Sequence, residues 1–164
     1  MSQKPILVNR IVALSNVIGC MFVLTNPSSH VCYQFKVGHL LAIIACTLSY
    51  IYHLCETKHG QPLMAGFTQE EVHRNLDADR FGAVVCAIYC LYALPSYSNE
   101  IMGLGIVGLV CLGISESRLL RDRLFLGRHV GTLWVFCLFH SIWHLCAFSI
   151  LARATASDTF ILRS

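Results

Sequence analysis

Two histidines lie four residues apart within an apolar stretch, as His140-Ser-Ile-Trp-His144. In a helix, residues i and i+4 lie on the same face, one turn apart. One helix could therefore offer both imidazoles to a single metal ion. Histidines at this spacing also occur where they only pack against neighbouring helices and bond to carbonyl groups, so both interpretations stay open for this pair alone.

A second group of polar side chains lies at the end of an earlier apolar stretch and before the next one. Ser49 and His53 are again four residues apart, and Asp77 and Asp79 follow in the chain. Each has an ordinary explanation when taken singly. Ser49 could bond back to a carbonyl of its own helix, and His53 could face interfacial water. The two aspartates could cap the next helix, where the dipole favours carboxylates.

The elements that must position these residues are apolar. Five stretches contain no Lys, Arg, Asp or Glu, and they cover Ile11–Thr25, Val37–Cys55, Phe81–Pro95, Ile101–Ser115 and Gly131–Ala152. A membrane-spanning helix needs about 20 mostly apolar residues. The second and fifth stretches are long enough, the first becomes so with residues 7–10, and the third and fourth predict a tight helical hairpin turning at 95–99. None alternates as barrel strands do.

We therefore expect an all-α polytopic transmembrane helix bundle of about five spans, with six as the alternative, in a single membrane domain over residues 1–164. The composition agrees, because the chain is 55% hydrophobic and 13% charged, with a mean hydropathy of +0.62. Soluble domains are usually about 25% charged. This excludes a disordered chain, a basic nucleic-acid-binding protein and an ordinary cytosolic enzyme. Most of the nine cysteines lie inside the apolar stretches, where cysteine behaves as a small apolar residue.

A five-span topology brings the polar groups together. The second stretch ends, and the third and fifth begin, at the same membrane face. His53, one of the two aspartates, and the His140–His144 pair then gather in one half of the bilayer, where ionisable residues indicate a functional site. Three histidines with an open fourth position for water are typical of catalytic zinc. A nearby carboxylate could activate that water, and a hydroxyl could stabilise an oxyanion.

The combined motifs resemble the CREST superfamily of membrane zinc hydrolases, which includes alkaline ceramidases. They are Ser-xxx-His at the end of the second helix, Asp at the start of the third and His-xxx-His in the last. The similarity is greatest to the branch with the GPI-processing phospholipase and myomaker. Residues 52–56, Tyr-His-Leu-Cys-Glu, stand where that branch has a Tyr-His-x-Cys-Asp-like run, and His-Ser-Ile-Trp-His recurs at 140–144. An aromatic residue follows the branch's Asp by four positions, as Phe81 follows Asp77, which favours Asp77 over Asp79.

This resemblance implies a zinc ion held by His53, His140 and His144, with Asp77 positioning or activating water and Ser49 supporting the site. It implies hydrolysis of an ester or amide bond of a membrane lipid. Family members have seven helices, so a five-span chain would be a shortened member that lacks two walls of the substrate cavity. The alternative is a non-catalytic receptor, fusion or assembly factor, in which a fourth protein ligand closes a structural zinc site.

The basic residues also predict an orientation. Most of the 12 Lys and Arg residues lie in the N-terminal segment and in the loops at 56–80 and 116–130. Cytoplasmic loops carry such an excess, so we expect a multi-pass protein with a cytoplasmic N-terminus and a site open to the cytoplasmic leaflet. That orientation favours a lipid of this leaflet over a GPI anchor. The small residues of Gly103-Leu-Gly-Ile-Val-Gly108 could allow close helix packing within the chain or in a homodimer.

Overall fold

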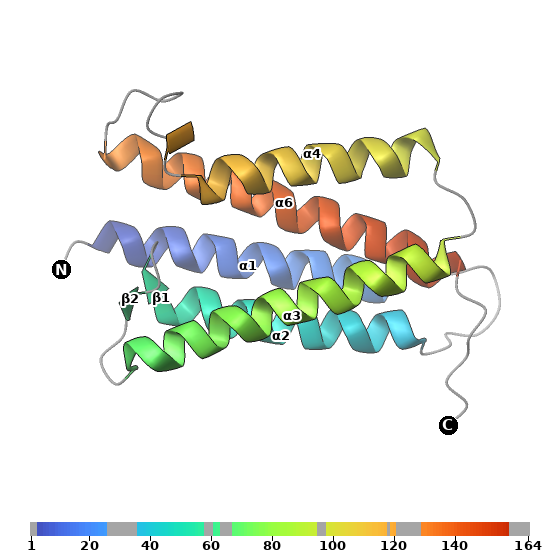
Figure 1. Ribbon diagram of the computed structural model, residues 1–164, viewed down its shortest axis with the longest axis horizontal. Helices are drawn as coiled ribbons and strands as arrows, with labels where there is room; N and C mark the ends of the chain where they lie inside the picture. Colours follow the sequence, from blue (N-terminus) through green and yellow to red (C-terminus); the bar gives the residue numbers. More distant parts are fainter. Residues whose placement is uncertain are drawn as a thin grey trace.

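Five long helices form an up-and-down bundle in the computed structural model, which describes residues 3–25, 36–57, 61–62, 67–94, 98–117, 119–120 and 129–157 (Figure 1). The helices are α1 (Gln3–Thr25), α2 (Val37–Cys55), α3 (Gln69–Ala93), α4 (Asn99–Glu116) and α6 (His129–Ser157). Two short strands, β1 (Glu56–Thr57) and β2 (Gln61–Pro62), pair antiparallel after α2. The expected helical bundle is confirmed.

Four of the helices in the described part of the chain are long and apolar enough to cross a membrane. Their apolar segments are Leu7–Thr25, Val37–Cys55, Asn99–Glu116 and Leu133–Ser157. The fifth helix, α3, is different because charged residues fill its first half and the apolar run begins only at position 81. At 25 residues, however, α3 is about 37 Å long and extends along the whole bundle (Figure 1). These features indicate an integral membrane protein.

The start of α3 corrects the sequence-based interpretation of its aspartates. The helix begins at Gln69, well inside the segment expected to be a loop. Thr68 caps it: the Thr68 side chain accepts from the Glu71 backbone N–H at 3.2 Å, and the Glu71 carboxylate accepts from the Thr68 N–H at 2.7 Å. This reciprocal arrangement satisfies two N–H groups that a helix start leaves open. Asp77 and Asp79 therefore lie about two turns inside α3, and the idea that they cap it is wrong.

Helix α6 is the central element of the bundle. It contacts each of the other four helices, while α1 also packs on α2 and α2 on α3. Among the described residues, α3 and α4 make no extensive contact with each other. The largest apolar core lies toward the ends of α1 and α6, around Val23, Phe148 and Leu151. A single helix that touches all the others can collect side chains from every part of the fold.

The bundle ends are arranged as the topology argument requires. The C-terminal ends of α2 and α4 and the N-terminal ends of α1, α3 and α6 lie at the same end of the molecule (Figure 1). Residues 95–97 of the expected hairpin turn, and most of the loop at 116–130, lie outside the described residues. The orientation of the bundle in the membrane stays a prediction.

Close helix approach depends on specific glycines. A Cβ atom at Gly19 would lie 2.5–2.9 Å from three atoms of the Phe148 side chain, and one at Gly108 would lie 3.1 Å from Cys146. The absence of a side chain at Gly19 and Gly108 therefore lets α1 and α4 pack closely on α6. By contrast, a Cβ at Gly103 would meet nothing within 4 Å. Gly108 of the small-residue run therefore serves packing inside the chain, and the homodimer stays a prediction.

We predict opposite effects of two glycine-to-alanine substitutions. Gly19→Ala should lower the free energy of unfolding by about 1–3 kcal/mol, because the new methyl group overlaps the Phe148 ring. Gly103→Ala should be neutral or stabilising by up to about 1 kcal/mol, because alanine is the better helix former. Thermal unfolding of detergent-purified protein measures both. Equal stability of the two variants would contradict the packing of α1 on α6.

Candidate metal centre

Three histidines from two helices converge inside the bundle. His53 lies in the last turn of α2, and His140 and His144 lie one turn apart in the middle of α6. Their exposed fractions are 0%, 6% and 5%. The ring centroid of His53 lies 4.8 Å from that of His140 and 5.3 Å from that of His144, and the centroids of the two α6 rings are 4.7 Å apart. The sequence-predicted trio is therefore assembled, and His53 does not face water.

The three side chains fit a metal ion. One ring nitrogen from each histidine can be chosen so that all three lie within 4.8 Å of one another. Tetrahedral coordination at about 2.1 Å would bring such nitrogens to roughly 3.4 Å, which small side-chain rotations can achieve. Imidazole is a good ligand for zinc, copper, iron and nickel, so the donor set admits a metal without choosing one. The cluster could hold one metal ion.

Polar side chains of two further helices contact the outer nitrogens of the α6 pair. Ser15 of α1 places its Oγ 2.9 Å from His144 Nδ1. Ser115 of α4 places its Oγ 3.1 Å from His140 Nδ1, and the neighbouring Glu116 places Oε1 3.2 Å from the same nitrogen. Both histidines are thus held through Nδ1 by oxygen atoms. Helices α1 and α4 therefore belong to the site, although neither supplies one of the three ligands.

The sequence analysis missed these three oxygen-bearing residues. Ser15 was one polar residue inside an apolar stretch, and Ser115 and Glu116 marked the end of another. The sequence held a weak signal for them, because a polar side chain inside a span needs a partner and Ser115 and Glu116 end their stretch at the face where the histidines gather. Pairing them with particular histidines required the packing of α1 and α4 on α6.

Ser49 and one of the two aspartates lie beside the cluster. Ser49 is 4% exposed, and its hydroxyl makes no back-bond to a carbonyl of its helix. It faces Asp79, which lines the same cavity as Ser49 and His144. Asp79 is partly buried on α3. Asp77 is exposed on α3, so the position beside the cluster belongs to Asp79.

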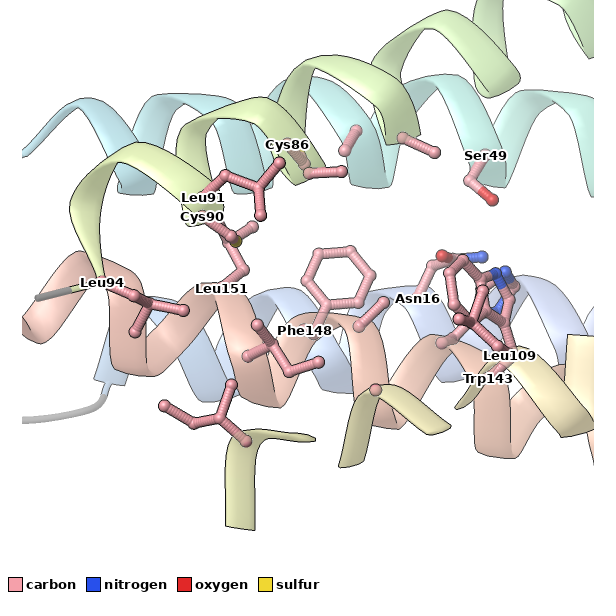
Figure 2. Close-up of a pocket in the computed structure, with 18 of the residues that line it drawn as sticks. Asn16, Ser49, Cys86, Cys90, Leu91, Leu94, Leu109, Trp143, Phe148 and Leu151 are labelled. Atoms are coloured by element: carbon pink, nitrogen blue, oxygen red, sulfur yellow. The ribbon is translucent and has the colours of Figure 1, made fainter. Parts of the chain in front are cut away.

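A cavity of about 440 Å³ leads away from the cluster (Figure 2). Its polar lining residues include Asn16, Ser49, Asp79 and His144, with Ser49 and Asn16 toward one end and Leu94 at the other (Figure 2). The other lining residues come mainly from α3, α4 and α6 and are almost all apolar. Because α3 and α4 barely touch, the cavity lies where the bundle is least closed. An apolar space thus ends at a group of imidazole, hydroxyl and carboxylate side chains.

We predict that the cluster retains about one metal ion per chain through purification without chelators, because three buried imidazoles converge on one point. His53→Ala, His140→Ala and His144→Ala should each lose it. His73→Ala is the matched control, since His73 is exposed on α3 and bonds to the Gln69 carbonyl instead. Elemental analysis gives the ratio. Metal-free wild-type protein, or loss of metal in the His73 variant, would contradict the assignment.

Comparison with known proteins adds no assignment at this point. The chain matches no protein-family model, no curated protein and no solved structure. The case for function therefore rests on the side chains of the site and on the cavity that reaches them.

Proposed function

We propose that this protein is a membrane-embedded, zinc-dependent hydrolase that cleaves an ester or amide bond of a lipid. One observation carries the proposal: the apolar cavity of about 440 Å³ ends at the histidine cluster, beside Ser49 and Asp79. A hydrolase for lipids needs a space for hydrocarbon that leads to a polar reaction centre. The resemblance of the motifs to the CREST superfamily supports the same chemistry.

The dimensions of the cavity suit a lipid chain. From Asp79 to Leu94, α3 rises about 22 Å. The hydrocarbon of one leaflet is about 15 Å deep, half of a roughly 30 Å core. One acyl chain can therefore lie along the cavity with its ester or amide carbonyl near the histidines. The limited contact between α3 and α4 offers a way in from the bilayer.

The residues at the polar end supply complementary groups. The Asp79 carboxylate would accept a proton from the attacking water as general base. The Ser49 hydroxyl would donate a hydrogen bond to the oxygen of the carbonyl as negative charge develops on it. His53, His140 and His144 would hold zinc, which supplies Lewis acidity that activates water and polarises the carbonyl. The general-base role passes from Asp77 to Asp79 because only Asp79 lines the cavity.

The number of ligand side chains favours catalysis over a purely structural metal. A structural zinc site is normally closed by four protein ligands, whereas a catalytic one keeps a position open. Within the described ranges, the only group of converging ligand side chains consists of the three histidines. This count supports the hydrolase over the non-catalytic alternative.

We predict that Asp79→Asn lowers lipid hydrolysis by about 10²–10⁴-fold, because a carboxamide cannot accept the proton. Zinc content should stay at the wild-type level, since the carboxylate is not one of the three ligands. Asp77→Asn is the matched control: it lies two residues away on an exposed part of α3 and should keep full activity. The assay compares product release from mixed ester- and amide-linked lipid vesicles containing each purified variant.

Three results would count against this proposal. Zinc-loaded wild-type protein that hydrolyses none of the lipids would contradict the hydrolase function. An Asp79→Asn variant with full activity would remove the general base. Loss of activity in Asp77→Asn with Asp79→Asn unaffected would restore the sequence-based choice of aspartate.

A further inference from the structure

Each serine that contacts an α6 histidine also lies within hydrogen-bonding distance of a carbonyl of its own helix. Ser15 Oγ donates to the Val12 carbonyl oxygen at 2.6 Å, and Ser115 Oγ donates to the Leu112 carbonyl oxygen at 2.9 Å. In each case the acceptor is the carbonyl three residues earlier in the same helix. A hydroxyl has one proton and can donate only once. Because a carbonyl can only accept, both contacts of each serine are hydrogen bonds together only if the serine donates to the carbonyl and accepts from the histidine.

The bond from each ring must run in the opposite direction, from nitrogen to oxygen. His144 Nδ1 lies 2.9 Å from the Ser15 oxygen, and His140 Nδ1 lies 3.1 Å from the Ser115 oxygen. For either contact to be a hydrogen bond, Nδ1 must carry the proton. Glu116 adds a second acceptor 3.2 Å from His140 Nδ1, and an ionised carboxylate also cannot donate. Three oxygen atoms from two helices thus favour the Nδ1–H tautomer in both rings.

We propose that Ser15, Ser115 and Glu116 are positioning residues that fix His140 and His144 as Nδ1–H tautomers and leave Nε2 of each ring as the metal-binding nitrogen. A neutral imidazole with a proton on Nδ1 has its free lone pair on Nε2. This inference rests on the proposed zinc site, because it names the atoms through which that site binds. It also assigns a function to α1 and α4, which hold the ligands of α6 in place.

The burial of the cluster makes the preference for the Nδ1–H tautomers stronger. Both rings and both serines are buried, with exposed fractions of 6% or less. With the other tautomer, either the Nδ1 lone pair faces a serine lone pair or the serine gives up its bond to the carbonyl, and the buried position offers few other partners. Oxygen acceptors on the outer nitrogen of a ligating histidine fix its tautomer and orientation. Their removal typically costs 10–100-fold in metal affinity.

The first test measures zinc affinity by chelator competition in detergent-purified protein. Ser15→Ala should bind zinc about 10–100-fold more weakly, because the His144 ring loses its acceptor. Ser15→Thr keeps the hydroxyl and should recover most of the affinity. Ser149→Ala is the matched control, since the Ser149 hydroxyl donates to the Leu145 carbonyl on α6. Unchanged affinity in Ser15→Ala would overturn the positioning role of Ser15.

His140 has two acceptors, so its variants should show partial redundancy. Ser115→Ala and Glu116→Ala should each weaken zinc binding less than the double variant, in which both acceptors are gone. Glu100→Ala controls for loss of a carboxylate on the same helix, because Glu100 pairs with Arg153 at 3.0 Å. A double variant with wild-type affinity would overturn the role of this pair.

A second measurement needs no substitution and separates this inference from the proposed function. Nitrogen-15 NMR of histidine-labelled, metal-free protein should show Nδ1 protonated and Nε2 bare in His140 and His144. On addition of zinc, the Nε2 resonances should shift while Nδ1 keeps its proton. A proton on Nε2 would overturn the inference even if zinc binds. Tautomers as expected in a protein that binds no zinc would instead contradict the proposed zinc site.

Discussion

The requirement to satisfy the hydrogen bonding of three imidazole rings buried inside the bundle governs the rest of this structure. Each neutral ring has one nitrogen that donates and one that accepts, and an apolar interior offers neither partner. The fold answers this by bringing the rings together and by placing oxygen atoms beside the outer nitrogens of His140 and His144. A cation at the centre would complete the arrangement, because it takes up the lone pairs that point inward. The proposed zinc is thus consistent with the need of these buried rings for polar partners.

The central position of α6 makes it possible to supply these polar partners. Since α6 touches each of the other four long helices that the structure describes, it can present one face to α2 for the third ligand and its flanks to α1 and α4 for the supporting oxygens. Gly19 and Gly108 bring α1 and α4 close enough to α6 for these contacts. The remaining side, between α3 and α4, is loosely packed and holds the cavity. One helix therefore organises the ligands, their supports and the approach of a substrate.

Much of this site could be predicted from the sequence, because its ligands follow helical spacing. The i, i+4 pair in α6 and the parity of the spans place His53 with His140 and His144, as the structure has them. The choice between Asp77 and Asp79 could not be made reliably, since it depends on the rotation of α3, and Thr68 starts that helix earlier than the apolar pattern indicated. The supporting role of Ser15 depends on contact between residues 129 positions apart, which spacing alone does not encode.

X-ray absorption spectroscopy at the zinc edge, on wild-type protein purified without chelator, tests the central claim most directly. It reports the identity of the metal, the kinds of ligand atom and their distances in one experiment. The account predicts zinc with three nitrogen ligands at about 2.0–2.1 Å and one additional oxygen ligand at about 2.0–2.2 Å. Sulfur ligands at about 2.3 Å, a fourth histidine, or the absence of zinc would contradict it.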